Sequence, residues 1–152
     1  MPLPTTNMVL NLDASAIVGL VDNDTVTTWE DSGAGNHDAT SLAGTPKYRT
    51  NVLNSLPVVR FDGASALQCA DAGSFDLTSA YTIFVVGKAT SGSFCGKNDA
   101  GTALGGRRKL QVNKGQHFSG TDSALIRYYG HGCGPAEYYV YAIRVTGTTT
   151  FQ

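Results

Sequence analysis

The sequence has little charge and no surplus of either sign. Charged residues make up 15% of the 152 residues, and 11 basic side chains nearly balance 12 acidic ones. This balance excludes the broad positive surface that general nucleic-acid or acidic-membrane binding requires. No run approaches about 18 apolar residues, so we expect no membrane insertion.

Cysteine is scarce and its spacing is uninformative. Cys69, Cys95 and Cys133 lie far apart and form no Cys-x-x-Cys pair, which excludes a metal knuckle or redox pair written in the sequence. At most one disulfide can form. One bridge with one free thiol stays open as an alternative, but we favour three buried free thiols that behave as small apolar residues.

The first residues, MPLPTTNMVLNLDAS, lack the basic and apolar regions of a signal peptide. We expect residues 1–7 to form a short arm that precedes the domain. A secreted destination would then need a non-Sec route or a leader that had already been removed.

Glutamate is also rare, and this limits the enzyme classes. Glycoside hydrolysis needs two carboxyl groups about 5 to 9.5 Å apart. Glu30 and Asp31 are adjacent, so a strand would point them to opposite faces, and Glu137, the second glutamate, stands alone. Gly-x-Ser-x-Gly is absent as well. We expect no enzymatic activity.

Alternating apolar residues indicate an all-β protein. Period-two patterns occur over Met8–Leu12, Tyr81–Val85, Leu110–Val112 and Tyr139–Val145, and 18 glycines accompany frequent turn residues. Helical periodicity is nearly absent. Only Ala14–Leu20 could form a helical turn or two, with Ser15 as its N-cap. With no repeat or linker, we expect one domain over residues 1–152.

Two segments indicate a particular fold. Val26–Thr40 (VTTWEDSGAGNHDAT) predicts a strand that ends at Trp29, a polar turn and a return strand, while Leu53–Gly63 (LNSLPVVRFDG) predicts a strand that enters an Asp-Gly hairpin turn. With Leu12–Ser15 and Tyr81–Val86, these segments resemble the concanavalin A-like, laminin G-like jelly-roll domains of bacterial surface and phage virion proteins.

The resemblance covers residues 8–90 well and the remainder loosely. It implies an antiparallel β-sandwich, or jelly roll, in which the matching motif residues are structural. These motif residues are Trp29, Asp31, Gly33, Asn36, His37, Arg60, Phe61, Asp62 and Gly63.

The end of the sequence resembles an unfinished hairpin. Tyr138–Val145 predicts a strong strand, Thr146-Gly147 a turn, and Thr148–Gln152 a partner strand that stops at once. Members of the resembled family continue with further strands that close the sandwich. We therefore expect the last strands to be missing, in a fragment or a natural short form. The open sheet edge would then be covered by further sequence or by another chain, in an oligomer or a larger assembly.

Aromatic and basic residues in the second half are the candidate ligand-binding residues. His131 lies between glycines, close to two tyrosines that could stack on a sugar, and the single basic cluster could meet an anionic glycan or an acidic subunit. The alternative for His131 and the tyrosines is an exposed loop that binds nothing. The alternative for the basic cluster is the solvated start of a strand. The candidates are Tyr128, Tyr129, His131, Arg107 and Arg108.

Calcium is the cofactor that the resemblance implies, because similar domains bind it at their rim through Asp and backbone oxygens. Asp99 and Asp122 are the candidate ligands, although isolated loop aspartates also form turns. Trp29 could be a sugar platform, but the resemblance favours an inward packing role for it.

The leading functional prediction is a non-enzymatic carbohydrate-binding or adhesion module of a phage virion or a bacterial surface, outside the cell. The alternative is a structural virion protein, such as a capsid decoration or fibre subunit, that binds neighbouring subunits. A glycosidase-like enzyme ranks third. A large exposed apolar face would favour assembly, whereas a concave face with aromatic rings and amides would favour glycan binding.

Overall fold

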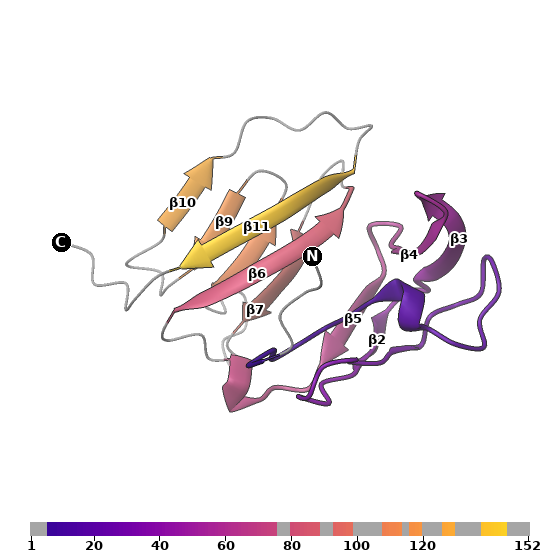
Figure 1. The fold of residues 1–152 in the computed structure, drawn as a ribbon, viewed down its shortest axis with the longest axis horizontal. Helices are drawn as coiled ribbons and strands as arrows, with labels where there is room; N and C mark the ends of the chain where they lie inside the picture. The colour runs from indigo at the N-terminus through magenta and orange to yellow at the C-terminus, as the bar shows by residue number, and fades with distance from the viewer. Residues whose placement is uncertain are drawn as a thin grey trace. The chain divides into compact units, whose positions relative to one another are not determined.

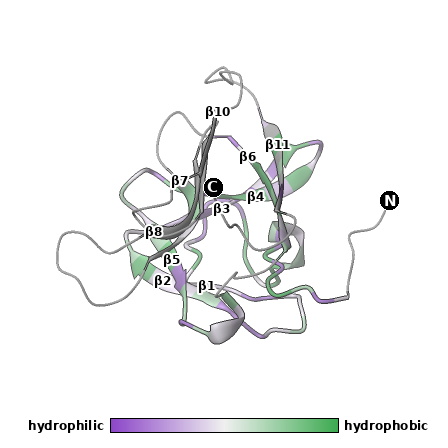
Figure 2. Ribbon diagram, turned by 90° about the vertical axis from the view of Figure 1, so that its left-hand side faces the viewer, coloured by the Kyte–Doolittle hydropathy of each residue, from purple (hydrophilic) through white to green (hydrophobic). Residues whose placement is uncertain are grey.

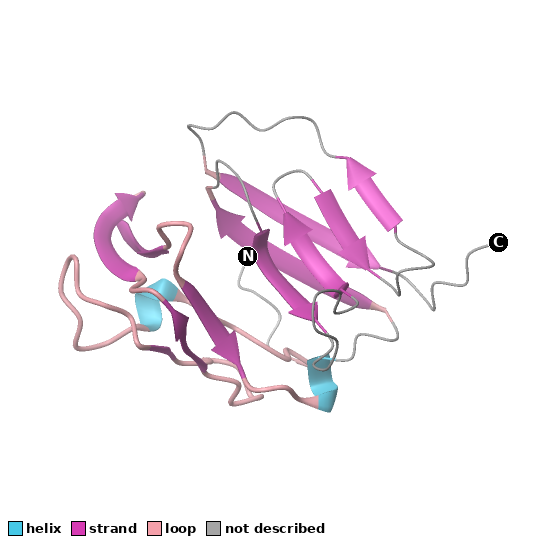
Figure 3. Cartoon of the chain, turned by 180° about the vertical axis from the view of Figure 1, so that it is seen from behind, coloured by secondary structure: helices cyan, strands magenta, loops and turns pink. Residues whose placement is uncertain are grey.

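The chain is built from antiparallel strands with almost no helix. The computed structural model describes residues 6–75, 80–88, 93–98, 108–113, 116–119, 126–129 and 138–145. In these ranges the only helices are two short 3-10 turns, drawn in cyan in Figure 3, and every strand pair is antiparallel. The all-β prediction is therefore confirmed.

The chain divides into two compact units, Met1–Phe75 and Asp76–Gln152. Unit 1 has a three-stranded sheet of order β1-β2-β5 and a separate pair β3-β4 (Figure 1). Its elements are η1 (Ala14–Ala16), β1 (Thr28–Trp29), β2 (Ala39–Ala43), β3 (Lys47–Leu53), β4 (Leu56–Arg60), β5 (Ala66–Cys69) and η2 (Gly73–Phe75).

The first motif folds as the sequence predicts. β1 ends at Trp29, a polar turn follows, and β2 returns antiparallel with Trp29 opposite Ala39. The strand β3, in contrast, lies partly in a stretch where no strand was predicted. Its hairpin with β4 turns through Asn54 and Ser55, whose φ angles of 50° and 64° fit the two-residue turn that matches strand twist.

The core of unit 1 is small and lies around Val26. Val26, Ala39 and Tyr48 are its buried apolar residues, and Pro46 is fully buried beside them. The Val26 amide donates to the Pro46 carbonyl at 2.8 Å, and the Tyr48 amide donates to the Asp24 carbonyl at 2.9 Å. Backbone pairing therefore holds the core residues in contact.

Two local predictions in the N-terminal region are wrong. Residues 8–12 form no strand, because the Asn11 backbone bonds instead to Asp31 and Ser32. The helical segment is the single turn η1, and its N-cap is Asp13, whose side chain accepts from the Ser15 amide at 2.8 Å. The Asp13 carboxylate is the stronger acceptor, so it takes the capping position expected for Ser15.

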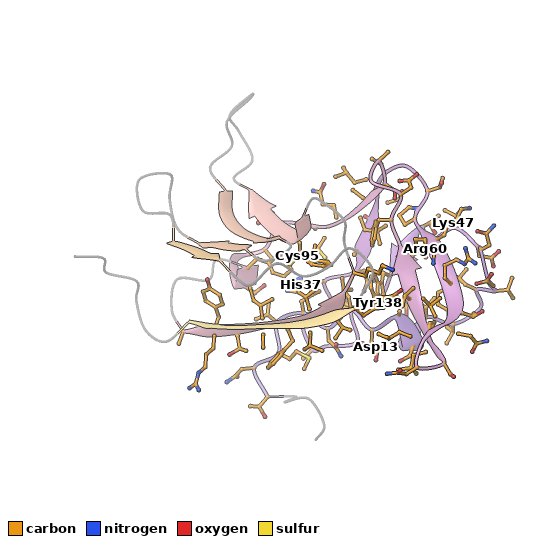
Figure 4. The ribbon with its side chains drawn as sticks, turned by 90° about the horizontal axis from the view of Figure 1, so that it is seen from above. Asp13, His37, Lys47, Arg60, Cys95 and Tyr138 are labelled. Carbon is orange, nitrogen blue, oxygen red and sulfur yellow. The ribbon has the colours of Figure 1, made fainter. Side chains whose placement is uncertain are left out.

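Asp62 and Gly63 form a turn, but the turn does not close a hairpin. β4 pairs with β3 and β5 pairs with β2, so the segment between them connects two sheets. The Asp62 carboxylate accepts the amides of Ala64 and Ser65 at 2.9 and 2.8 Å, and Gly63 has a φ of 89°. Arg60 ends β4, opposite Lys47 (Figure 4). Phe61, the next residue, is exposed.

Unit 2 contains a four-stranded sheet of order β10-β9-β8-β7 and a two-stranded sheet of β6 and β11 (Figure 1). The alternating patterns of Tyr81–Val85, Leu110–Val112 and Tyr139–Val145 correctly predicted three of its strands. The strands are β6 (Tyr81–Gly87), β7 (Ser93–Asn98), β8 (Arg108–Asn113), β9 (Gln116–Ser119), β10 (Ile126–Tyr129) and β11 (Tyr139–Val145).

Strand β6 has two distinct faces. Tyr81, Ile83 and Val85 are half-buried, whereas Thr82, Phe84 and Val86 are exposed. On the inner side, a Cβ added to Gly87 would lie 2.5 Å from Cε1 of Phe94 on β7. The Phe94 ring therefore occupies the space that a side chain at position 87 would need.

The cysteines only partly follow the prediction. Cys69 is a half-buried free thiol on β5, and burial raises its pKa, as do the nearby charges of Asp31 and Asp38. Cys95 on β7 is also free; the residue as a whole is exposed, but burial around its thiol raises the pKa to about 11, so the expectation of a buried thiol stays a prediction at this position. Cys133 lies outside the described residues.

Candidate functional site

The polar turn between β1 and β2 is organised by Asp31, whose side chain is 8% exposed. Its Oδ1 accepts the amides of Asn11 and Gly33, each at 2.8 Å, and its Oδ2 accepts the His37 amide at 3.0 Å. The Asp31 amide in turn donates to Oδ1 of Asp38 at 2.8 Å. Asp31 therefore joins residue 11 to both ends of the turn.

The electrostatics of Asp31 suit a structural anion. Burial by itself raises the pKa of Asp31, but the amides of His37, Asn11 and Gly33 and the charge of His37 outweigh it, and the pKa is lowered from 3.8. Because both oxygens hold backbone amides, the carboxylate is poorly placed to exchange protons with a substrate. Asp31 thus serves as a hydrogen-bond acceptor that organises the turn.

The other motif residues complete this turn. Asn36 adopts a φ of 51°, and a Cβ at Gly35 would overlap the carbonyl oxygen of Val9. Trp29 is half-buried, and its Nε1 is buried with no hydrogen-bond partner among the described residues. A half-buried ring with a covered polar edge suits packing better than sugar stacking.

His37 connects the turn to η2. Its Nε2 lies 2.8 Å from Oγ of Ser74, and its ring centroid is 4.5 Å from that of Phe75. A nucleophilic serine would need such a base, together with a third group that orients the imidazole and a cavity for substrate. The hollow of about 120 Å³ in unit 1 is lined by neither residue.

That hollow lies against η1 and β1 and contains one acidic group. Ile17, Leu20 and several threonines line it, and Glu30 is the only carboxylate among its described lining residues. Glycoside hydrolysis needs a pair of carboxyl groups. The hollow therefore offers no basis for that reaction.

The predicted ligand-binding residues do not converge in the part of the sheet that is described. Arg108 begins β8, whereas Tyr128 and Tyr129 on β10 pair through β9 with positions 112 and 113 at the other end of β8. Four or five strand residues separate these positions, which is roughly 14 to 17 Å. Arg107, His131, Asp99 and Asp122 lie outside the described residues.

Among the described residues of unit 2, the exposed large apolar side chains lie on the outward face of β6 and β11. The register places Val86 opposite Val140, Phe84 opposite Ala142 and Thr82 opposite Arg144. Directly opposed residues of antiparallel strands share a face. All six are exposed, with 53% for Phe84, 59% for Val86 and 71% for Val140. Figure 2 shows the hydrophobic colouring along β6.

Positive charge flanks this face at both ends. Beyond Val86, the Lys88 ammonium lies 5.8 Å from the ring centroid of Tyr138, which precedes β11 (Figure 4). Arg144 is exposed at the other end. The segments 80–88 and 138–145 contain no acidic residue. We call the four rows 88/138, 86/140, 84/142 and 82/144 the outward face.

Sequence reasoning indicated part of the outward face. It predicted both strands from their alternation, and the register then places positions 139 and 141 opposite Gly87 and Val85, on the other side from the outward face. It did not single out Phe84, Val86 or Val140. The sequence does contain a signal for them on β6, because Phe84 and Val86 form a second apolar set that alternates with Ile83 and Val85.

Comparisons with models of protein families, with curated proteins and with solved structures find no match to this chain. Among the residues that the structure describes, no group of three or more His, Cys, Asp or Glu is placed to hold a metal ion. No helix in the same residues is long and apolar enough to cross a membrane.

Proposed function

We propose that this chain is a non-catalytic interaction module, and that its outward face binds a neighbouring protein subunit in a larger assembly. The observation that carries the proposal is the row of exposed apolar side chains on paired strands, with Phe84, Val86 and Val140 each more than half exposed. Large apolar side chains exposed side by side on paired strands mark a candidate interaction site.

We now place binding to a neighbouring subunit ahead of carbohydrate binding, which was the leading prediction from the sequence. A glycan site would combine aromatic rings with amide and carboxylate side chains in a concave surface. The outward face has valines at its centre and neither amides nor carboxylates in its four rows. A protein partner therefore suits it better than a sugar.

The proposal includes a fold and a location that rest on the resemblance. We infer a concanavalin A-like sandwich, and we infer that the assembly is a phage virion or a bacterial surface structure. Support for the non-catalytic part comes from the saturated carboxylate of Asp31 and from the single acid in the hollow of unit 1.

Carbohydrate binding remains the second candidate because of one specific feature. The Tyr138 ring beside Lys88 would offer an aromatic surface and a cation to a sugar, although the ring is only half-exposed. A glycan array tests this directly. Binding that Tyr138→Ala abolishes, with no protein partner for the face, would replace the proposed function.

Site-specific photocrosslinking tests the protein-partner proposal. A benzophenone side chain at position 140 is expected to give an adduct heavier than the chain in the cells or particles that carry the protein. Val18 in unit 1, which is 83% exposed, is the matched control position and is expected to give little or none. The absence of a heavier adduct at position 140, or equal yields at both positions, would contradict the proposal.

A further inference from the structure

We infer that the partner of the outward face is a second copy of this chain, related by a two-fold axis parallel to β6 and β11. This inference rests on the proposed function and identifies the molecule that binds the outward face. Its basis is the combination of side chains that the strand register sets opposite one another.

The geometry of such a dimer follows from the symmetry. A two-fold axis along the strands, placed above the midline of the pair, carries β6 of one copy over β11 of the other. Each row of one copy then lies directly over the same row of the other copy. A residue of one copy therefore meets the cross-strand partner of the same position in the other copy, and the contact is isologous.

Side-chain volumes match under this operation. Phe84 of one copy meets Ala142 of the other, which combines a large side chain with a small one, and Val86 meets Val140, which combines two of equal size. The interface has two columns, each formed by β6 of one copy over β11 of the other. Both columns contain the same side chains and are filled evenly, as close packing requires.

The alternative two-fold axis, perpendicular to the strands, fits less well. It would place β6 over β6 and β11 over β11, so that Phe84 meets Val86 in one column and Val140 meets Ala142 in the other. One column would be overfilled while the other was left with a gap, and both defects weaken packing.

The charged ends are also compatible with the first arrangement. Lys88 of one copy faces Tyr138 of the other, and Arg144 faces Thr82, so each cation meets an aromatic or hydroxyl group. The cation–aromatic contact that each chain makes within itself at 5.8 Å can thus be repeated between copies.

The size of the face sets the strength of the contact. Four rows on two strands cover roughly 270 Å² per copy, from a rise of about 3.4 Å per residue and a strand spacing of about 4.8 Å. A stable interface buries about 800 Å² per partner. We therefore expect a weak, concentration-dependent contact that becomes firm where many copies are held together.

Two single variants and their mixture test the inference. Val86→Asp and Val140→Lys are each expected to weaken self-association about tenfold or more, because each buries an unpaired charge. In an equimolar mixture, Asp at position 86 meets Lys at position 140 of the other chain, while the remaining Val86 and Val140 meet as in the native dimer. The mixture is therefore expected to recover the mass of the wild-type dimer in light scattering.

Val18→Asp is the matched control and is expected to leave the wild-type mass unchanged. A wild-type chain that stays at 16.0 kDa at high concentration overturns the second copy as occupant. Self-association that both variants leave intact overturns it too, and failure of the mixture overturns the two-fold arrangement. The crosslink at position 140 separates these failures from failure of the proposed function, since an adduct with a different protein would support the function while excluding the second copy.

Discussion

The two compact units are held together in different ways. In unit 1, aspartate side chains accept backbone amides at Asp13, Asp22, Asp31 and Asp62, and short strands surround a small core. In unit 2, β6 and β11 pair along seven residues each and expose one apolar face. The comparison indicates that polar capping stabilises unit 1, whereas strand pairing both stabilises unit 2 and sets out the exposed outward face.

The largest expected effect comes from breaking the Asp31 contacts. Asp31→Ala removes the acceptor of three backbone amides, and we expect a loss of about 3 kcal/mol in the free energy of unfolding because half-buried donors are left unpaired. Denaturant unfolding measures the loss, and hydrogen exchange should show faster exchange in unit 1 than in β6 and β11. Glu30→Gln, an exposed change at the next residue, is the control. Equal losses in the two variants would refute the role assigned to Asp31.

A smaller effect is expected from the inner side of β6. Gly87→Ala forces a methyl group against the Phe94 ring, and we expect a cost of about 2 kcal/mol that is felt mainly in unit 2. Thermal unfolding and hydrogen exchange check this. The control is Gly73→Ala, where an added Cβ meets no atom within 4 Å. A cost at position 87 no larger than that at position 73 would argue against the packing of Phe94 on β6.

Some of the elements in these two units could be predicted from the sequence, and others could not. Alternation predicted β6, β8 and β11, because a strand with one covered face shows period two locally. It did not predict β3, whose only buried residue is Tyr48, nor the loss of the Met8–Leu12 strand, which depends on distant Asp31.

The candidate site shows the same limit. The motif residues around Asp31 were named from the family resemblance, which needs only a local stretch of sequence; their donors lie mostly within one turn, with Asn11 as the distant exception. The outward face needs the register between β6 and β11, which are far apart in sequence. Only pairing reveals that Phe84 lies opposite Ala142 and Val86 opposite Val140.

Acid is expected to weaken unit 1 more gradually than the loss of Asp31 does, since a protonated carboxyl group can still accept hydrogen bonds. The folded pKa of Asp31 lies below 3.8, so its stabilising contribution is complete above pH 3.8 and is lost as the pH falls through the folded pKa. Unfolding of Asp31→Asn should depend less on pH in this range. Some dependence should remain, because the pKa values of Asp22 and Asp62 are also lowered. Identical pH profiles for wild type and variant would contradict this assignment.

The smallest expected effect is the loss of the Lys88–Tyr138 contact. Lys88→Met keeps the length of the side chain but removes the charge, and we expect a cost of about 0.5 kcal/mol or less, because Lys88 is exposed and Tyr138 is only half-buried. A double-mutant cycle with Tyr138→Leu measures the coupling. A zero coupling energy would mean that the two groups contribute independently.

The most direct test of the central claim is hydroxyl-radical footprinting of Phe84 in the native assembly and in the dilute isolated chain. Phe61, which is 44% exposed in unit 1, is the internal reference for Phe84 at 53%. If the outward face binds a neighbouring subunit, oxidation of Phe84 will fall several-fold in the assembly relative to Phe61. Equal oxidation of Phe84 in both states would show that the face stays open to solvent, and would contradict the account.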